Sequence, residues 1–247
     1  MLAALRRRLA DSELFSYNQV RRDRWIARQA AALPAGARVI DIGAGSCPYR
    51  AHFAHCSYVT QDFVALREEQ LRYSKYGQID YVCDAASVPV PDGSFDAILC
   101  SEVLEHYPAP IDLLREFARL LAPGGTLILT APLGSGIHQE PYHFYGGYTP
   151  YWYEKFLTAA GFSAPRIEAN EGSLRAYAQE SIRFLRNTRP FRLGMPLPAE
   201  LLWAPLWLLL LPLLGVFVSV ACKLMDRYDK ERRTTVGYHV TATRLGR

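Results

Sequence analysis

The sequence lacks the paired cysteine spacing of structural zinc sites and disulfide frameworks. Its 247 residues include five cysteines, an odd number, and no two of them stand as Cys-x-x-Cys. We therefore expect free thiols in a reducing compartment. His52, His55 and Cys56 lie close together, but no second cysteine or histidine pair follows at zinc-finger spacing, so we expect no metal site.

The chain also has a modest net charge, which gives no indication of a nucleic-acid partner. Charged residues make up 21% of the chain and the net charge is +4 at pH 7, so the composition does not indicate a nucleic-acid partner. No apolar run follows the first arginines, so we expect no signal peptide and an intracellular protein. With 50% hydrophobic residues, the chain is globular in composition and is neither disordered, collagen-like nor coiled-coil. Its length suits one large domain, or one domain with an appendage.

The order of the predicted elements indicates an α/β protein. Short apolar runs alternate with helical stretches, which is typical of a parallel sheet covered by helices. The predicted strands are Arg38–Ile42, Tyr58–Gln61, Ile79–Cys83, Phe95–Cys100, Thr126–Ala131, Pro165–Ala169 and Val236–Thr243. The predicted helices are Leu14–Leu33, Pro48–Ala54, Val64–Leu71, Ile111–Leu121, which ends at Ala-Pro-Gly-Gly, and one from Thr149-Pro150 to Gly161.

The end of the first predicted strand resembles a nucleotide-binding loop. Asp41-Ile-Gly43-Ala-Gly45 places glycines where the backbone can approach a ligand closely. The dinucleotide fingerprint requires a third glycine where this chain has Pro48, so nicotinamide or flavin binding is disfavoured. The alternative is a tight strand-to-helix turn without a ligand.

Acidic residues follow the next two predicted strands as well. Asp62 ends the second strand, where a carboxylate can accept hydrogen bonds from both ribose hydroxyls, and Asp84 ends the third, where a side chain can meet an adenine edge. Parallel strands all end on one edge of their sheet, which is where ligands bind. Asp41, Asp62 and Asp84 are therefore expected on one rim.

With these residues the chain resembles the class I S-adenosylmethionine-dependent methyltransferases, and most nearly the bacterial group called methyltransferase type 11. The matching motifs are Asp41-x-Gly43-x-Gly45, Asp62, the run from Asp84 through Pro89 and Asp92 to Asp96, Glu102-x-x-Glu105-His106, and Ala122-Pro-Gly-Gly125. The resemblance covers residues 37–161, with 236–243 as the final strand. Cys47 stands where many members have a further glycine.

The resemblance implies a Rossmann-like fold with a seven-stranded, mostly parallel sheet and helices on both faces, with an apolar helical insert before the last strand. It implies S-adenosylmethionine as the cofactor, with S-adenosylhomocysteine as its product. By the same resemblance Asp41, Gly43 and Gly45 line the methionine part, Asp62 holds the ribose, and Asp84 with Ala85 the adenine. Ser101 and Glu102 face the sulfonium. Asp96 is expected to be structural and His106 to position other groups.

A long segment after the fifth strand, residues 132–149, is the expected substrate loop. Loops of this length on the functional rim of a compact domain are usually functional. His138, His143 and Glu140 are the candidate catalytic groups, and Tyr142, Tyr145 and Tyr148 the candidate substrate contacts. The alternative is a packed aromatic lid in which the histidines only satisfy backbone groups.

The segment Leu201–Cys222 contains no charged residue and would be about 33 Å long as a straight helix, enough to cross a bilayer. Basic residues flank it on both sides, and the final strand must rejoin the sheet, so both ends belong on the cytoplasmic face. We favour a re-entrant or surface-lying helical hairpin, with Pro205, Pro212 and Gly215 breaking it into shorter pieces. A soluble lid or dimer-forming helix pair and a true span are the alternatives.

These observations predict four regions: an N-terminal helical cap at 1–36, a cofactor-binding core at 37–172, a helical, membrane-associated insert at 173–233, and the final strand at 234–247. The predicted activity is O-methylation of a lipid or lipid-linked acceptor, such as a glycan carrier or quinone precursor, on the inner face of the membrane. The alternatives are a methyltransferase for a soluble small molecule, a non-catalytic cofactor-binding membrane subunit, and a nicotinamide-dependent oxidoreductase. The sequence leaves the oligomeric state open.

Overall fold

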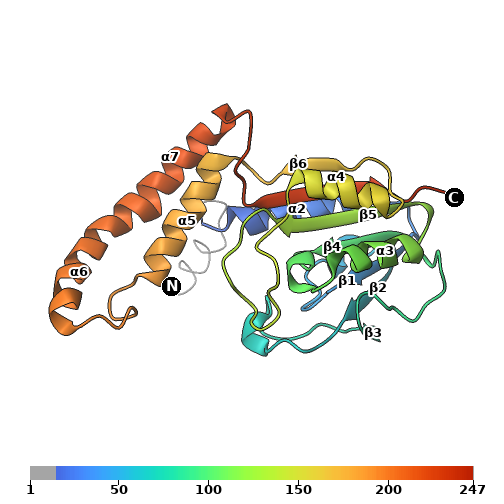
Figure 1. Ribbon diagram of the computed structural model, residues 1–247, viewed down its shortest axis with the longest axis horizontal. Helices are drawn as coiled ribbons and strands as arrows, with labels where there is room; N and C mark the ends of the chain where they lie inside the picture. Colours follow the sequence, from blue (N-terminus) through green and yellow to red (C-terminus); the bar gives the residue numbers. More distant parts are fainter. Residues whose placement is uncertain (1–14, 247) are drawn as a thin grey trace. The chain divides into compact units, whose positions relative to one another are not determined.

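The computed structural model describes residues 15–246, which form two compact units (Figure 1). Residues 22–168 and 237–246 form the first, here called the sheet unit, and residues 15–21 and 169–236 form the second, the helical unit. The division falls a few residues from the predicted start and end of the insert. It differs from the predicted 1–36 cap, because most of helix α2 (Tyr17–Ala31) belongs to the sheet unit.

The sheet has seven strands in the order β3-β2-β1-β4-β5-β7-β6. The strand bounds are β1 Arg38–Ile42, β2 Ser57–Asp62, β3 Tyr81–Val82, β4 Phe95–Ser101, β5 Leu121–Pro132, β6 Arg166–Ala169 and β7 Gly237–Thr243. Strands β1 to β5 pair in parallel, and β7 pairs antiparallel with β5. The predicted Rossmann-like fold class is confirmed.

Helices cover both faces because the central strands are near-continuous apolar runs, whose side chains point alternately to the two faces and need burial on each. On one face Trp25 and Ile26 of α2 pack against Val39, Leu99 and Ile128. On the other, Tyr153 of α4 (Pro150–Ala159) meets the ring of Tyr238 on β7. Helix α3 (Pro110–Leu120) buries its apolar side as well. The centre of the sheet is thus shielded from water, which leaves its edges and strand ends for ligands.

Two local predictions about helix ends are confirmed. Thr149 caps α4 as predicted, because its hydroxyl accepts a hydrogen bond from the Trp152 N–H at 3.3 Å. The helix predicted at 111–121 also ends where expected, at Leu120, but the Ala-Pro-Gly-Gly segment after it is part of a strand, since β5 already begins at Leu121 beside Phe95. An irregularity in the pairing between Phe95 and Ala97 accommodates these residues within the strand.

The prediction of two short helices at 48–54 and 64–71 is wrong. The structure has single 3₁₀ turns there, η1 (Arg50–Phe53) and η2 (Glu68–Gln70). Val64 has a φ of 53°, in the left-handed region, and Leu66 donates its N–H to the Tyr76 hydroxyl instead of to a helical carbonyl. These two features prevent a helix from propagating through the segment.

The helical unit contains α5 (Ser173–Asn187) and a continuous helix over Leu197–Tyr228. The continuous helix is made of α6 (Leu197–Leu210), the π-helical segment η4 (Leu211–Phe217), α7 (Val218–Met225) and η5 (Asp226–Tyr228). The predicted breaks at the prolines are therefore wrong. Pro212 lies in the π-helical turn, where a shifted hydrogen-bond register absorbs its missing N–H.

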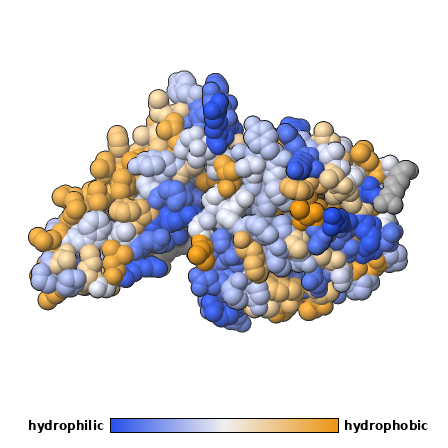
Figure 2. Space-filling model, in the orientation of Figure 1, coloured by the Kyte–Doolittle hydropathy of each residue, from blue (hydrophilic) through white to orange (hydrophobic). Residues whose placement is uncertain are grey.

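This long helix packs on α5 with one side and exposes the other. Trp203 and Trp207 donate their indole N–H groups to the carbonyls of Thr188 and Leu185, at 2.7 and 3.1 Å. The outward side is apolar, and Figure 2 shows these hydrophobic residues gathered along α6 and α7. Its most exposed members include Leu202, Leu209 and Phe217, at 78%, 73% and 65%. By length and composition the helix is long enough to cross a membrane.

Candidate functional site

A pocket of about 460 Å³ opens at the carboxyl ends of β1, β2 and β4 in the sheet unit. This volume lies in the range of small-molecule sites. The pocket wall contains all of the residues that the sequence assigned to the cofactor, namely Asp41, Gly43, Gly45, Asp62, Asp84, Ala85, Ser101 and Glu102. Residues from separate strand ends thus meet around one cavity, as the parallel sheet predicts.

The glycine loop after β1 requires its glycines. Gly43 and Gly45 have φ values of +68° and +51°, and a Cβ on Gly43 would lie 2.4 Å from a methyl of Val103. The loop is fastened to β2, because Gly45 donates its N–H to the Asp62 carboxylate at 2.9 Å and Gly43 to Gln61 at 3.3 Å. The loop is therefore preformed, with bare backbone facing the pocket.

Asp41 is a buried carboxyl group in the pocket wall. It is 2% exposed, and the Tyr58 hydroxyl donates a hydrogen bond to it. Burial raises the pKa of Asp41 to about 7, although the Tyr58 hydrogen bond opposes this shift. A carboxyl in this state favours a cationic ligand group, since a positive charge would compensate for its lost hydration.

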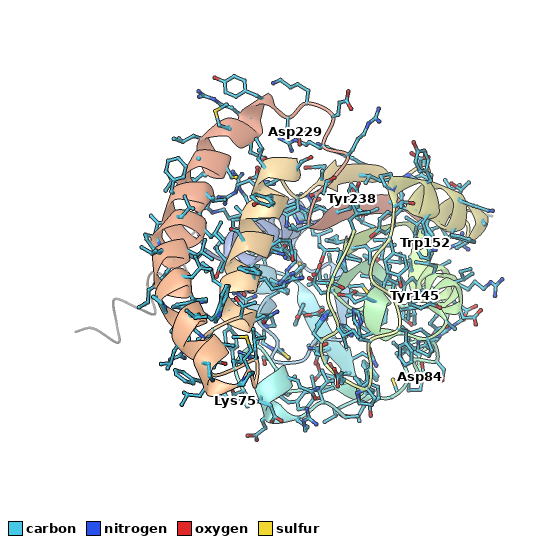
Figure 3. All side chains as sticks on the ribbon, turned by 60° about the vertical axis from the view of Figure 1, so that its left-hand side comes forward. Lys75, Asp84, Tyr145, Trp152, Asp229 and Tyr238 are labelled. Atoms are coloured by element: carbon cyan, nitrogen blue, oxygen red, sulfur yellow. The ribbon has the colours of Figure 1, made fainter. Side chains whose placement is uncertain are left out.

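Asp62 and Asp84 keep the ends of β2 and β3 in place. The Asp62 carboxylate accepts the N–H groups of Gly45 and Val64, both at 2.9 Å, and retains lone pairs for further donors. Asp84 accepts the Ala86 N–H at 2.8 Å and the Tyr107 hydroxyl at 2.7 Å. Figure 3 labels Asp84, which lies at this strand-end edge.

Ser101 and Glu102 lie at the end of β4. Ser101 is hydrogen-bonded to the Thr130 hydroxyl at 3.0 Å. Glu102 has a φ of 56°, and its carboxylate accepts from Thr130 at 2.9 Å and pairs with Arg22 at 2.9 Å. A side chain at this uncommon backbone conformation is aimed by a tight turn, as is frequent at functional sites.

Of the three tyrosines predicted to contact the substrate from the loop at 133–149, one lines the pocket and two do not. Tyr142 lines the wall, with its ring 5.0 Å from Phe63 in an edge-on arrangement. Tyr145, labelled in Figure 3, donates its hydroxyl to the Pro108 carbonyl at 2.9 Å. Tyr148 is buried and donates to the Leu104 carbonyl at 2.7 Å. Tyr145 and Tyr148 are thus not among the residues lining the pocket; they fix the base of the loop.

The three candidate catalytic residues of this loop, His138, Glu140 and His143, are not among the residues lining the pocket. His138 and His143 lie together, with ring centroids 4.7 Å apart, and both lie beside His106, at 4.7 and 5.7 Å. Of the three, His106 lines the pocket. Glu140 is exposed and is absent from the pocket wall.

Burial and mutual repulsion favour the neutral forms of His106 and His143. The pKa of His106 falls to about 4, chiefly through burial, and burial also lowers the pKa of His143. Glu105 beside His106 is 1% exposed, and burial raises the pKa of its carboxyl well above the usual range. The 3.7 Å approach of Glu105 to His106 is therefore not a salt bridge near neutral pH.

Several residues of the pocket wall were not predicted from the sequence. Phe63 directly follows Asp62, a predicted cofactor-binding residue, so its position in the sequence could have indicated that it lines the pocket. Arg22 and Gln139 reach the pocket from α2 and from the long loop, which only the tertiary fold brings there. Further such members include Gln61, Tyr49, Leu66, Leu71, Arg72, Tyr107 and Phe144.

Comparisons with known proteins agree with this site. Residues 40–129 match the family model described as a methyltransferase domain. This segment is thus a methyltransferase domain, and the resemblance drawn from the motifs is confirmed for it. A Ubiquinone biosynthesis O-methyltransferase of Xanthomonas campestris is 38% identical over 145 residues, covering 52% of this chain and 57% of that protein. The chain thus matches little more than half the length of that relative.

Solved structures extend the likeness in fold beyond the matched segment. A phosphoethanolamine N-methyltransferase of Haemonchus contortus, in complex with S-adenosyl-L-methionine, has a TM-score of 0.52 at 16% identity, over 91% of this chain and 52% of that one. The [4+2]-cyclase SpnF also has a TM-score of 0.52, at 19% identity, over 91% and 81%. At such identities the likeness concerns the fold alone, and these two neighbours differ in chemistry.

Proposed function

We propose that this chain transfers a methyl group from S-adenosylmethionine to an oxygen atom of a lipid or lipid-linked acceptor, and that it does so at the inner surface of a membrane. The single observation that carries the cofactor assignment is the meeting of all eight sequence-assigned residues around one pocket. The methyltransferase domain match and the ubiquinone-pathway relative support the reaction type.

The residues present fit this cofactor. Asp41 offers a buried carboxyl without a charged hydrogen-bonding partner where the methionine ammonium would lie. Asp62 retains acceptor capacity for the ribose hydroxyls, and the backbone at Gly43 and Gly45 allows close approach. Asp84 with Ala85 lies at the end expected for the adenine.

When bound, S-adenosylmethionine supplies a methyl group on a positively charged sulfur that leaves readily. Transfer would break the carbon–sulfur bond, with its electron pair left on sulfur, and would form a carbon–oxygen bond to the acceptor. The hydroxyl proton of the acceptor has to leave, and the imidazole of His143, which burial favours in its neutral form beside the pocket residue His106, is suited to receive it. The chain's main task is to hold the acceptor oxygen in line with the methyl group and to exclude water.

The lipid character of the acceptor is supported by the helical unit. A continuous apolar surface along Leu197–Tyr228 is larger than a soluble monomer normally exposes. Basic side chains stand at both ends of the apolar stretch and would attract anionic headgroups, by about 1 kcal/mol each close to the surface. These residues are Arg186, Arg189 and Arg192 at one end, and Lys223, Arg227, Lys230, Arg232 and Arg233 at the other.

The geometry favours a helix that lies along the membrane surface. A single span would separate β7 from the rest of the sheet by a bilayer, yet β7 pairs with β5 over its whole length. In a re-entrant hairpin the turn between α5 and α6 would lie deepest, but that turn carries Arg189 and Arg192. A surface-lying helix buries the exposed leucines and leaves these arginines at the headgroups.

Binding of S-adenosylhomocysteine to the purified protein, measured by calorimetric titration, tests the cofactor assignment. Asp62→Ala should weaken binding by about tenfold or more, because it removes charged acceptors for the ribose hydroxyls. Asp112→Ala, at an exposed acid on α3, is the matched control and should bind like the parent protein. If the parent protein does not bind this ligand, or if Asp62→Ala binds as well as the parent, the assignment is wrong.

A further inference from the structure

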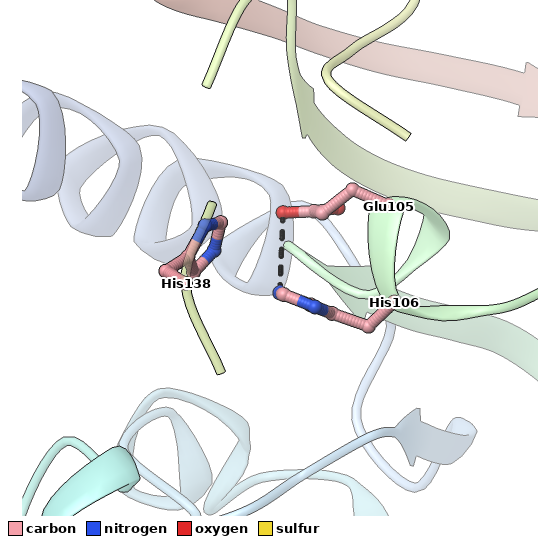
Figure 4. A group of neighbouring side chains, drawn as sticks. All are labelled: Glu105, His106 and His138. Atoms are coloured by element: carbon pink, nitrogen blue, oxygen red, sulfur yellow. Dashed lines mark ion pairs between the residues drawn. The ribbon is translucent and has the colours of Figure 1, made fainter. Parts of the chain in front are cut away.

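Glu105, His106 and His138 form a cluster at the border between the pocket and the long loop (Figure 4). Each offers one ligand-type atom, and these atoms all lie within 4.8 Å of one another. Glu105 and His106 come from the turn η3 (Leu104–His106) after β4, and His138 comes from the loop after β5. The fold therefore brings together residues that are far apart in the sequence.

Both imidazoles are oriented as metal-binding imidazoles usually are. The Nδ1 of His106 lies 2.8 Å from the Tyr142 carbonyl, and the Nδ1 of His138 lies 2.9 Å from the Gly136 carbonyl. A carbonyl only accepts, so each Nδ1 carries the proton and each Nε2 keeps a free lone pair. A backbone carbonyl on one ring nitrogen, with the other nitrogen free to coordinate, is the usual outer support of a metal-bound histidine.

Glu105 supplies an independent indication. It is buried, and its Oε2 atom has no hydrogen-bond partner among residues 15–246. A buried carboxyl oxygen without a partner is costly, and a bound cation would remove this cost. Its other oxygen, Oε1, lies 3.7 Å from the Nε2 of His106. Two ligands bound at about 2.0–2.2 Å to one tetrahedral ion are separated by roughly 3.5 Å, so this pair is already in place.

We infer that Glu105, His106 and His138 bind a divalent transition-metal ion, with zinc as the reference ion. Two imidazole nitrogens and one carboxylate are a known zinc set, whereas magnesium and calcium prefer oxygen ligands throughout. His138 has to approach by about an ångström. Its loop is exposed at this point and has glycines at 134 and 136, which permit the shift. This inference departs from the expectation of no metal, which rested on spacing along the chain.

The role of the ion rests on the proposed function. His106 belongs to the pocket wall, so an ion bound there faces the space beside the cofactor residues. Three protein ligands leave a coordination position open. An acceptor hydroxyl bound at that position would lose its proton more easily and would be held in a fixed orientation. The cluster would then select acceptors with a hydroxyl that can reach the ion.

Titration of the chelator-treated full-length protein with zinc chloride, followed by calorimetry, tests the site. The parent protein should bind one zinc ion per chain, and millimolar magnesium should not displace it. His138→Ala and Glu105→Gln should each weaken zinc binding by about tenfold or more. His138 is exposed, so its removal should leave the fold intact, as circular dichroism would verify. His52→Ala, at another exposed histidine of the sheet unit, is the control and should bind zinc like the parent.

The site is refuted if the parent protein fails to bind zinc at micromolar concentration, or if His138→Ala binds as tightly as the parent. A parallel titration of the same samples with S-adenosylhomocysteine keeps the two claims separate. A parent protein that binds S-adenosylhomocysteine but does not bind zinc would overturn this inference and leave the proposed function standing. Zinc binding in a protein that does not bind S-adenosylhomocysteine would support the metal site and remove the role assigned to it.

Discussion

At the scale of single residues, the carboxyl groups at the strand ends were predictable and their partners were not. Asp41, Asp62 and Asp84 could be placed because each follows an apolar run, and parallel strands end on one edge. The partners of these acids, such as Tyr58 and Tyr107, come from packing between elements. The histidines were singled out from the sequence, but their grouping was not, since His106 and His138 meet only after the loop has folded over the pocket.

Asp41 leads to a prediction about pH. Its pKa of about 7 in the ligand-free protein means that it is mostly protonated at pH 6 and mostly ionised at pH 8. Only the ionised form pairs with the ligand ammonium, so affinity for S-adenosylhomocysteine should rise by about tenfold from pH 6 to pH 8. Calorimetric titrations at the two pH values measure this. Asp41→Asn should bind weakly and without the rise, and a parent affinity equal at both pH values would contradict the role of Asp41.

At the scale of elements, strands of the central sheet were read well because two periodicities alternate clearly along the chain. The short segments after β1 and β2 were read less well, because an apolar residue every third or fourth position also suits a single 3₁₀ turn. In the long helix, the prolines were expected to break the helix, and they do not. Packing on α5 and a local π-helical turn keep Leu197–Tyr228 continuous.

The start of α5 depends on two acids that come from the far end of the helical unit. Asp226 is buried and accepts the N–H groups of Gly172 and Arg175, at 2.8 and 2.9 Å. Asp229, labelled in Figure 3, accepts the Ser173 N–H at 2.6 Å. These side chains satisfy N–H groups that a helix cannot satisfy itself, and their charge suits the positive helix end.

Replacement of Asp226 should therefore destabilise the helical unit. Asp226→Asn keeps the shape but loses the charge and one acceptor, and it should lower the free energy of unfolding by about 1–3 kcal/mol. Urea denaturation followed by circular dichroism measures the change. Asp229→Asn, at the more exposed partner, should have a smaller effect. An Asp226→Asn protein as stable as the parent would show that these hydrogen bonds do not hold the helix start.

At the scale of the whole molecule, the chain combines a sheet unit that contains the pocket with an inserted helical unit. The sheet unit contains the complete pocket. The helical unit is inserted between β6 and β7 and presents an apolar surface with basic ends. The fold class could be predicted from the sequence because the motifs lie on the central strands. The acceptor could not be predicted, because the residues expected to contact it lie in a loop that follows no fixed periodicity.

Membrane attachment is testable with substitutions that leave the interior unchanged. Leu202→Glu, Leu209→Glu and Phe217→Glu together place charges on exposed positions of the long helix and should abolish co-flotation with vesicles containing anionic lipid. Ile137→Glu with Tyr151→Glu, at positions 76% and 79% exposed in the sheet unit, is the matched control. Flotation of the triple variant at the parent level would contradict the attachment, as would a parent protein that stays in the soluble fraction.

Transfer of a labelled methyl group tests the central claim most directly. Membranes containing the protein are incubated with S-adenosylmethionine that carries a radioactive methyl group, and the solvent-extracted lipid is then counted and treated with acid and base. We predict label in the lipid fraction as a stable ether. Its amount should fall strongly in Asp62→Ala and remain unchanged in Asp112→Ala. Label confined to water-soluble products, or no incorporation above that of membranes lacking the protein, would contradict the account.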